Sequence, residues 1–391
     1  MRNVLALTFV TALATSAIAP AQALPTGTIA IAGDVMNTLA TALPGGGTST
    51  THTPPLGFTP HVMLWDPSSP DSFIVGGQSF PPGVMKRVTF LTPTSTTVTN
   101  ITPLPGQTSL IDNPGQLSWS QSGQEVIVID RNLDQIVAVN VATGAETLVT
   151  SGPQPWGNAL HCGAVDPLSG DIFVGTTTNA IYRVAATPTG QVISLLQGGF
   201  PAAIERIVFD DSHIGMPGSP YFLTFAMANS IQRIDLNAPA ITTQTFFAGS
   251  PLQNIRSLTI DHQGNFLFGV NGNDVYHLMN TPNNPASASL PTFVVGSSTQ
   301  GFLNWDVAVV GGTTTPFRLT LQSVAGMGFI TTENHPASTA QGFLLLTLAT
   351  NFSRGAGPLL GIFPDAITLA ILDKPAIPGD ALHWTSVVPA P

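Results

Sequence analysis

The chain has 391 residues, carries a formal net charge of −10 at pH 7, and has charged residues at only 8% of its positions. This acidic balance argues against a nucleic-acid partner, which would require a basic surface. A mean hydropathy of +0.29 argues against disorder, and 38 Gly and 34 Pro punctuating a chain rich in Thr, Ser and Val favour many short strands over helices.

The first 23 residues predict a secretory signal peptide. Arg2 supplies a positive start, residues 4–19 are apolar and uncharged, and Ala21, Gln22 and Ala23 form a small-x-small cleavage site. The alternative is a transmembrane anchor, but the apolar stretch is shorter than the roughly 20 residues that cross a bilayer. We therefore expect a bacterial protein that is secreted, periplasmic or on the cell surface, with no transmembrane segment after signal cleavage.

Residues 24–310 predict a repeat-built, all-β domain. Thr26–Ala42 reads as two strands, and five units of several short strands follow it. The first strand of each unit ends at Asp66, Ser120, Asp166, Asp210 or Asp261, and these closing residues lie 44 to 54 residues apart. Four short antiparallel strands in about 45 residues make one blade of a β-propeller. The five units are His61–Val98, Gln116–Val149, Ala159–Leu196, Ile204–Phe247 and Asn254–Leu278.

A turn of the form Asp-x-x-Gly supports this repeat. It occurs at Asp261–Gly264, with Ser as the weaker cap at Ser120–Gly123, and one residue longer at Asp166–Gly170. An Asp side chain accepts a hydrogen bond from the backbone two residues on, and Gly tolerates the positive φ of a tight reversal.

The strand expected at Phe302–Val310 predicts how the propeller closes. Propellers commonly complete one blade from both ends of the domain, which removes exposed sheet edges. Pairing this strand with Thr26–Ala42 gives six blades, with five and seven as alternatives. No turn follows Asp306, so the strand could instead belong to the next domain.

From residue 311 to residue 391 the pattern changes to strands separated by Pro- and Gly-rich turns. This region predicts a small β-sandwich-like C-terminal module, or an incomplete one, because no closing strand is evident before Pro391. The expected strands are Pro316–Ser323, Gly342–Leu348, Ala366–Leu372 and Ala381–Val388.

Two resemblances accompany these patterns. The unit Asn254–Leu278, with its hydrophobic-x-Asp-x-x-Gly-Asn turn, is similar to the repeats of NHL-type, YVTN-type and gluconolactonase-like propellers. The segment from Gly357 to Trp384 resembles a β module at the ends of exported proteins of planctomycete-type bacteria. The gluconolactonase-like resemblance implies an acidic metal ligand in the opening blade, where this chain has His61 instead.

Aligning the first strands places five positions in register, five residues before each closing residue. In a propeller this strand lines the central channel, so these side chains should converge on one mouth. Imidazoles and a carboxylate can hold a divalent cation, with His61, His161 and Glu205 as ligands, whereas Arg256 favours a carboxylated ligand. The simpler alternative is a hydrated channel that binds nothing specific. The five positions are His61, Gly115, His161, Glu205 and Arg256.

Other candidate sites receive less support. Cys162 is the only cysteine, so no disulfide forms within the chain, and a free cysteine is usually buried and inert. Asn271 to Asp274 are rich in oxygen ligands but lack an EF-hand loop, so a plain turn is favoured over a calcium site. The sequence carries no phosphate-loop or nucleophile-elbow motif.

Two functional classes follow from the sequence. The first is a non-enzymatic binding or interaction module with a protein, glycan or small molecule as its partner and no required cofactor. The second is a metal-assisted lactonase, hydrolase or lyase that uses the four side chains at the channel mouth and a metal-bound water.

Overall fold

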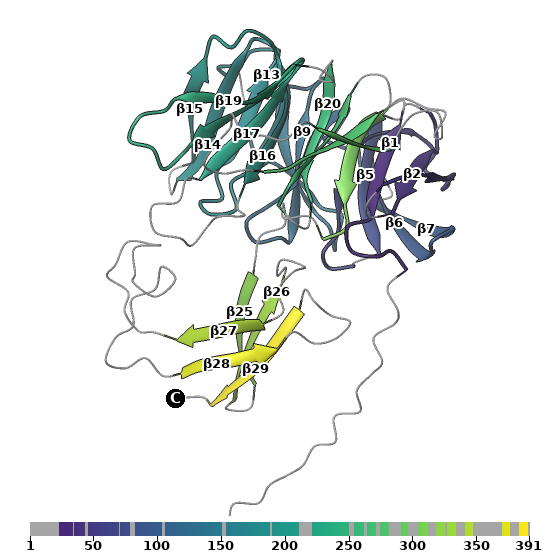
Figure 1. Ribbon diagram of the computed structural model, residues 1–391, viewed down its shortest axis with the longest axis vertical. Coiled ribbons are helices and arrows are strands. Elements are labelled where there is room, and N and C mark those ends of the chain that lie inside the picture. Colours follow the sequence, from purple (N-terminus) through teal and green to yellow (C-terminus); the bar gives the residue numbers. More distant parts are fainter. Residues whose placement is uncertain are drawn as a thin grey trace, which may run out of the picture.

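The structure is a computed structural model in which the chain forms strands and turns (Figure 1). Within the described residues there is no helix of the length and apolarity that a membrane crossing requires. Beyond residue 311 only the backbones of five strands are described, and the predicted signal peptide lies almost wholly outside the described part. Residues 23–311 are described apart from 34, 44–45, 70, 79–82, 104–105, 151–153, 188–189, 211–220, 250–253, 262–263, 271–273, 281–290 and 296–303.

Residues 29–309 form six four-stranded antiparallel sheets arranged as the blades of a β-propeller, which confirms the predicted fold class. Blade 1 consists of β24 (Asn304–Val309), β1 (Ile29–Gly33), β2 (Leu39–Ala42) and β3 (Ser49–His52). Blade 2 consists of β4 (Thr59–Trp65), β5 (Ser72–Gln78), β6 (Val84–Thr92) and β7 (Ser95–Thr102). Blade 3 consists of β8 (Pro114–Trp119), β9 (Glu125–Asp130), β10 (Gln135–Asn140) and β11 (Glu146–Leu148).

The remaining blades follow the same order from the channel outward. Blade 4 consists of β12 (Leu160–Val165), β13 (Ile172–Thr176), β14 (Ala180–Thr187) and β15 (Gly190–Gly198). Blade 5 consists of β16 (Ile204–Asp210), β17 (Phe222–Met227), β18 (Ser230–Asp235) and β19 (Thr243–Ala248). Blade 6 consists of β20 (Ile255–Ile260), β21 (Phe266–Val270), β22 (Val275–Leu278) and β23 (Thr292–Val295).

Blade 1 closes the ring by joining the two ends of the domain. Its innermost strand, β24, pairs with β1 from Ile29 opposite Val309 to Gly33 opposite Asn304, and the two lie side by side in Figure 1 despite their separation in the sequence. The expected closure is therefore confirmed. The outermost strand of this blade, β3, is polar and half-exposed, which is why the sequence pattern did not distinguish it from a loop.

The core is divided among the six interfaces between neighbouring blades. Each described hydrophobic cluster contains side chains from two consecutive blades. Alternate residues of one strand enter opposite interfaces, because successive side chains of a strand point to opposite faces. In β9, for example, Val126 and Val128 pack toward blade 2, whereas Ile127 and Ile129 pack toward blade 4.

Trp65 and Trp119 occupy equivalent positions at the ends of β4 and β8. Each is 4% exposed, and each lies in an inter-blade cluster, as their register predicts. The indole Nε1 of Trp119 donates to the carbonyl oxygen of Trp65 at 2.9 Å, so the two strand ends are also joined by a hydrogen bond.

The turn after the first strand has the expected chemistry. The Asp166 carboxylate accepts from the backbone N of Leu168 at 2.9 Å, two residues on. Gly123, Gly170 and Gly264 have φ values of +60°, +79° and +83°, and the N–H of each donates to the carbonyl of the residue that opens its turn. Glycine is therefore required at these reversals.

Beyond residue 311 the described strands form two small sheets that pair with no described strand of the propeller. The order of the first sheet is β25-β26-β29, and the second contains β27 and β28. Whether they pack as a sandwich stays a prediction. Their bounds are β25 (Arg318–Val324), β26 (Met327–Glu333), β27 (Gln341–Leu346), β28 (Ala370–Pro375) and β29 (His383–Pro389).

Candidate functional site

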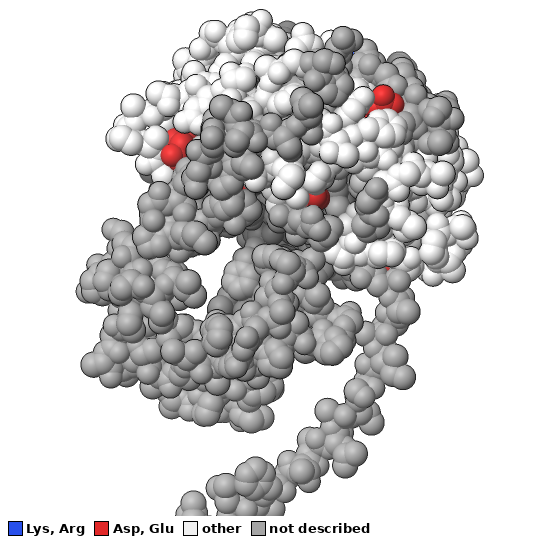
Figure 2. Space-filling view, viewed as in Figure 1, with Lys and Arg blue, Asp and Glu red and all other residues white. Residues whose placement is uncertain are grey.

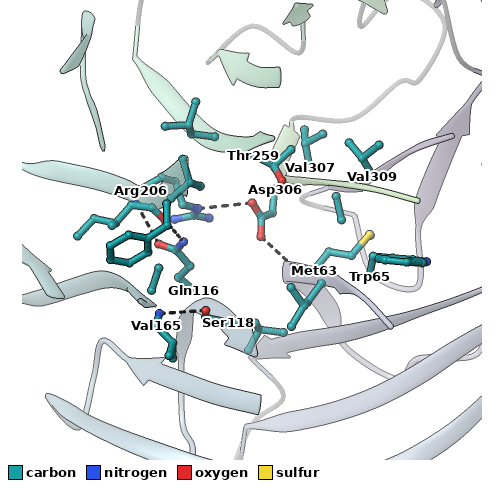
Figure 3. A pocket seen from close by; sticks show the side chains of 18 of the residues that line it. Met63, Trp65, Gln116, Ser118, Val165, Arg206, Thr259, Asp306, Val307 and Val309 are labelled. Carbon is teal, nitrogen blue, oxygen red and sulfur yellow. Dashed lines mark hydrogen bonds and ion pairs between the residues drawn. The ribbon is translucent and has the colours of Figure 1, made fainter. Parts of the chain in front are cut away.

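The innermost strands of the six blades surround a narrow central channel. Together they enclose a cavity of about 50 Å³ that is lined by main chain and side chains of β4, β8, β12, β16, β20 and β24 (Figure 3). A buried water needs roughly 10–15 Å³ on this measure, so the cavity suits a few waters rather than a sugar or nucleotide. A larger ligand would have to bind at a mouth of the channel.

Polar side chains cross the channel on one side of this cavity. Gln116 of β8 donates to the carbonyl of Ile207 in β16 at 2.6 Å and accepts from the N–H of Gly163 in β12 at 3.2 Å. The Arg206 guanidinium of β16 lies 3.4 Å from the Asp306 carboxylate of β24, which also accepts from the Met63 N–H of β4 at 2.9 Å. Figure 3 shows both bridges spanning the space between inner strands. The inner strands of blades 1 to 5 are thus joined to one another.

Each innermost strand contains a β-bulge at the same place. In blade 2 the register passes from Pro60 to Val62, so that His61 has no partner residue of its own on β5. The equivalent skipped residues are Gly115, His161, Glu205 and Arg256 in blades 3 to 6, and Trp305 in the backbone of blade 1. The four candidate residues predicted from the alignment are therefore the bulged residues of blades 2, 4, 5 and 6. We call the six bulged positions together the mouth ring.

A bulge bends its strand and re-aims a side chain, and bulges are over-represented next to binding and catalytic sites. Four of the six bulges carry a described polar or charged side chain, namely His61, His161, Glu205 and Arg256. In the mouth ring the side chains of His61, His161, Glu205 and Arg256 are partly buried, as expected at a sheltered opening.

His161 and Glu205 are in direct contact, with 3.1 Å between Nε2 and Oε2. His61 lies 3.4 Å from the side-chain oxygen of Asn113, in the segment that leads into blade 3. Arg256 acts on Glu205 through its charge, which helps to lower the pKa of that carboxyl. Of the four predicted residues, the structure therefore joins His161 and Glu205 by a hydrogen bond, and the charge of Arg256 acts on Glu205.

Arg131 is a member of the site that the sequence alignment did not reveal. It follows β9, and its side chain lies over Gly115, where a Cβ would come within 2.6 Å of its Nε. Its Nε donates to the carbonyl of His161 at 2.9 Å, and Nη2 donates to that of Gly115 at 3.3 Å. The guanidinium therefore occupies the place in the mouth ring that the glycine leaves open.

Burial and neighbouring charges shift the pKa values of the ionisable groups at the site. Burial, together with the charge of Arg206, lowers the pKa of Arg131 to about 10. Burial also lowers the pKa of His161 and of His61, and the charges of Arg131 and Arg206 lower both further. Burial opposes ionisation of Glu205, but the His161 hydrogen bond and the nearby cationic charges together hold its pKa below the usual value. At neutral pH the site has charged arginines, an ionised Glu205 and neutral imidazoles.

These shifts predict that the propeller loses stability as the pH falls below about 6.5. A folded-state pKa below the ordinary histidine value of 6.5 means that the unfolded chain binds protons first, so acidification favours unfolding. Each such histidine contributes at most about 1.4 kcal/mol per pH unit within its window. Melting temperatures between pH 7.5 and 5 should decrease, and less steeply in the variant H61Q/H161Q. Equal slopes for the two proteins would contradict the assignment to these histidines.

Cys162 follows His161 in β12 but faces the core rather than the mouth. It is fully buried between blades 4 and 5, where Sγ lies 3.3 Å from the carbonyl oxygen of Ile204. Burial raises the pKa of this thiol to about 12. A protonated, enclosed thiol is a poor nucleophile, which agrees with the expectation of an inert cysteine.

The described part of the chain contains no group of three or more His, Cys, Asp or Glu side chains arranged to hold a metal ion. His161 and Glu205 make a pair, and His61 is held at Asn113, so the predicted three-ligand set is not assembled in this arrangement. The residues 271–273 of the oxygen-rich turn lie outside the described part, and the calcium alternative there stays a prediction.

The fold and the mouth ring together define the chain as a six-bladed β-propeller protein with a polar site at one end of its channel. No family model and no curated protein matches the sequence. A solved structure titled as a nidogen/laminin complex has a chain with TM-score 0.54 and 11% identity, and the alignment covers 72% of this chain and 98% of that one. At this identity the likeness shows the fold alone.

Two further solved structures align less closely. An auxiliary nutrient binding protein from Bacteroides thetaiotaomicron has TM-score 0.44 and 12% identity over 69% of this chain and 64% of that one. A protein from Lactobacillus plantarum has TM-score 0.45 and 14% identity over 83% of this chain and 92% of that one.

Proposed function

We propose that this protein is an exported, non-enzymatic binding module whose ligand site is the mouth ring of its propeller. The observation that carries the proposal is the repeated bulge, which places chemically different side chains at equivalent positions around one opening. Four of the six positions carry polar or charged side chains, which a rigid spacer would not require. The narrow interior, at about 50 Å³, restricts the ligand to the mouth.

The test is a thermal-shift screen of the full chain against neutral sugars, amino acids, short peptides, carboxylates and inorganic phosphate. A ligand that binds the native state raises the melting temperature by mass action. We expect at least one compound to stabilise the protein, to do so less in H61Q/H161Q, and to be recovered chemically unchanged. The proposal is overturned if no compound stabilises the protein, or if every effect is the same in the variant.

A metal-assisted lactonase, hydrolase or lyase is the second candidate, and the contact between His161 and Glu205 is the observation that favours it. Such a pair can serve as a base for a metal-bound water. The charges of Arg206 and Arg256 act on this pair, and they repel a divalent cation. A shift of the melting temperature with Ca²⁺, Mn²⁺ or Zn²⁺ that is lost in E205Q would favour the enzyme over the binding module.

Export is part of the proposal, and one contact at the start of the propeller supports it. Cleavage after Ala23 would make Leu24 the first residue. Leu24 is 2% exposed in the cluster between blades 1 and 2, and its backbone N donates to the Asp71 carboxylate at 2.8 Å. After cleavage this nitrogen would be an ammonium group, so the hydrogen bond would become an ion pair.

This contact gives a prediction about processing. The exported protein should begin at Leu24 when its N-terminus is measured by mass spectrometry. Asp71→Asn should destabilise a chain that starts at Leu24 by about 0.5–1 kcal/mol more than a chain extended by residues 19–23, because only the former has the ammonium donor and the pair is partly screened by solvent. A different N-terminus, or equal losses in the two chains, would contradict the assignment.

The same proposal includes two relationships. The propeller would be related to the NHL-, YVTN- and gluconolactonase-like propellers, and the C-terminal module would be of the planctomycete type. The turn at Asp261–Gly264 supports the first. The partner could be a protein, a glycan or a small molecule. The charged side chains of the mouth ring bear on which of these classes binds there.

A further inference from the structure

The described basic residues fall into two groups. Lys86, Arg87 and Arg183 lie on third strands of their blades, and Arg233 is buried between the rings of Phe222 and Phe246. The others, Arg131, Arg206 and Arg256, lie at the channel. The face seen in Figure 2 shows scattered carboxylates and no Lys or Arg among its coloured atoms. Three of the seven described basic side chains therefore lie at the channel, in a chain with net charge −10.

The Arg131 guanidinium is held in place before any ligand arrives. Its hydrogen bonds to the carbonyls of His161 and Gly115 tie it to blades 4 and 3, and the missing side chain of Gly115 provides the space that it fills. A cation fixed in this way loses little conformational freedom when it binds a ligand. Two carbonyl contacts also leave guanidinium N–H donors for an incoming acceptor, since the group carries five.

Two carboxylates, Asp306 and Glu205, lie among the three arginines of the channel. Asp306 is buried and engaged by Arg206 and by the Met63 N–H, so it is committed to the interior of the channel. Glu205 accepts from His161 and is the ionised acid of the mouth ring. The charge of Arg206 acts on Arg131 and, after burial, lowers the pKa of that guanidinium. An anion that contacts Arg131 would offset this repulsion.

We propose that the mouth ring binds an oxyanion, either a carboxylate or a phosphate group of a small ligand, with Arg131 and Arg256 as its cationic contacts. Guanidinium matches both oxyanions, because its planar N–H fork can bond two oxygens at once. The ionised Glu205 repels an anionic ligand, so it disfavours ligands of higher negative charge. This inference rests on the proposed function and names the class of ligand.

The experiment compares succinate, inorganic phosphate and the neutral analogue succinamide by calorimetric titration of the full chain at constant ionic strength. We expect one of the two oxyanions to bind and succinamide not to bind. Tighter binding of succinate would identify the ligand group as a carboxylate, and tighter binding of phosphate would identify it as a phosphate group. Arg256→Gln should weaken binding by about 10-fold, the equivalent of one lost charge contact. Glu205→Gln should strengthen binding by about 3- to 10-fold, because it removes the opposing charge while it keeps an amide at the same place.

Arg183→Gln is the matched control. It removes one positive charge from the pair with Asp171 on blade 4, at a side chain that is 48% exposed, and it should leave affinity unchanged. The opposite signs expected for R256Q and E205Q exclude general destabilisation, which would weaken binding in both. Unfolding curves of each variant confirm that the propeller is intact.

Several results would overturn the inference. One is binding of succinamide as tightly as succinate, with no binding of phosphate. Another is weaker anion binding in E205Q, and a third is an equal loss in R183Q and R256Q. If a neutral sugar or peptide binds and depends on His61 and His161 while neither oxyanion does, the oxyanion class fails and the binding module stands. If nothing binds, both fail.

Discussion

Replacement of Asp306 by Ala should lower the free energy of unfolding of the propeller by about 3–5 kcal/mol. The Asp306 carboxylate is 5% exposed, accepts from the Met63 N–H of blade 2, and pairs with the almost fully buried Arg206 of blade 5. Removing one partner of a buried pair leaves the other charge without compensation, and this loss typically reaches that size. The change also removes the bond that joins β24 to β4, where the ring closes.

The measurement is the unfolding transition in urea or by heating, where the loss corresponds to roughly 6–10 °C at about 2 °C per kcal/mol. The double variant R206M/D306N should recover more than half of the loss, because it removes both charges and keeps an acceptor for Met63. Arg183→Ala is the control at an exposed ion pair and should cost less than about 1 kcal/mol. A loss in D306A no larger than in R183A would show that the channel pair does not stabilise closure.

Burial raises the pKa of Asp306, against the lowering effects of Arg206 and of the Met63 and Val307 N–H groups. A carboxyl whose pKa is higher in the folded state adds stability as the pH falls through its folded pKa toward the ordinary value of 3.8, and D306A lacks this gain. The difference in stability between wild type and D306A should therefore grow on acidification between those two pKa values. The histidine effect, measured on H61Q/H161Q, has the opposite sign.

The blades could be predicted from the sequence because their signals are local. Apolar strands, the capped turn with its glycine, and a recurring unit of 44 to 54 residues all repeat along the chain. Closure was harder to predict, since β24 lacks the Asp-x-x-Gly turn, and its membership of blade 1 depends on a long-range pairing with β1. Asp306 is an acid within an apolar strand, and burying such a charge is costly unless it has a buried partner. The residue therefore indicates a buried partner, although the sequence does not show which one.

The mouth ring could be predicted only in part, for a physical reason. The bulged positions lie five residues before the closing residue of each innermost strand, because every such strand has the same length from bulge to turn. A count along the sequence could therefore locate them. The alignment could not show that Gly115 is filled by Arg131, which enters from the turn after β9. Nor could it show that His161 meets Glu205 rather than His61, since contacts between neighbouring blades depend on rotamers and not on spacing.

Gly115 gives the second large expected effect. Gly115→Ala should lower the free energy of unfolding by about 1–3 kcal/mol, the usual range for overpacking. The new Cβ would lie 2.3 Å from the carbonyl oxygen of His161 and 2.6 Å from Nε of Arg131, closer than such atoms can approach. The clash with the carbonyl requires a shift of the backbone, and the clash with Nε should displace the Arg131 side chain as well.

Displacement of Arg131 has a signature beyond lost stability. The charge of Arg131 helps to lower the pKa of the His161 imidazole, after burial, so its departure should raise that pKa in an NMR titration of the histidine ring. Oxyanion binding at the mouth ring should weaken in the same variant. Gly198→Ala is the matched control: its Cβ would meet no atom closer than 3.8 Å, so stability and the His161 titration should be unchanged. An unshifted His161 pKa in G115A, with stability lost, would mean that the backbone alone gave way, and that Arg131 is held at the mouth more firmly than its two carbonyl contacts imply.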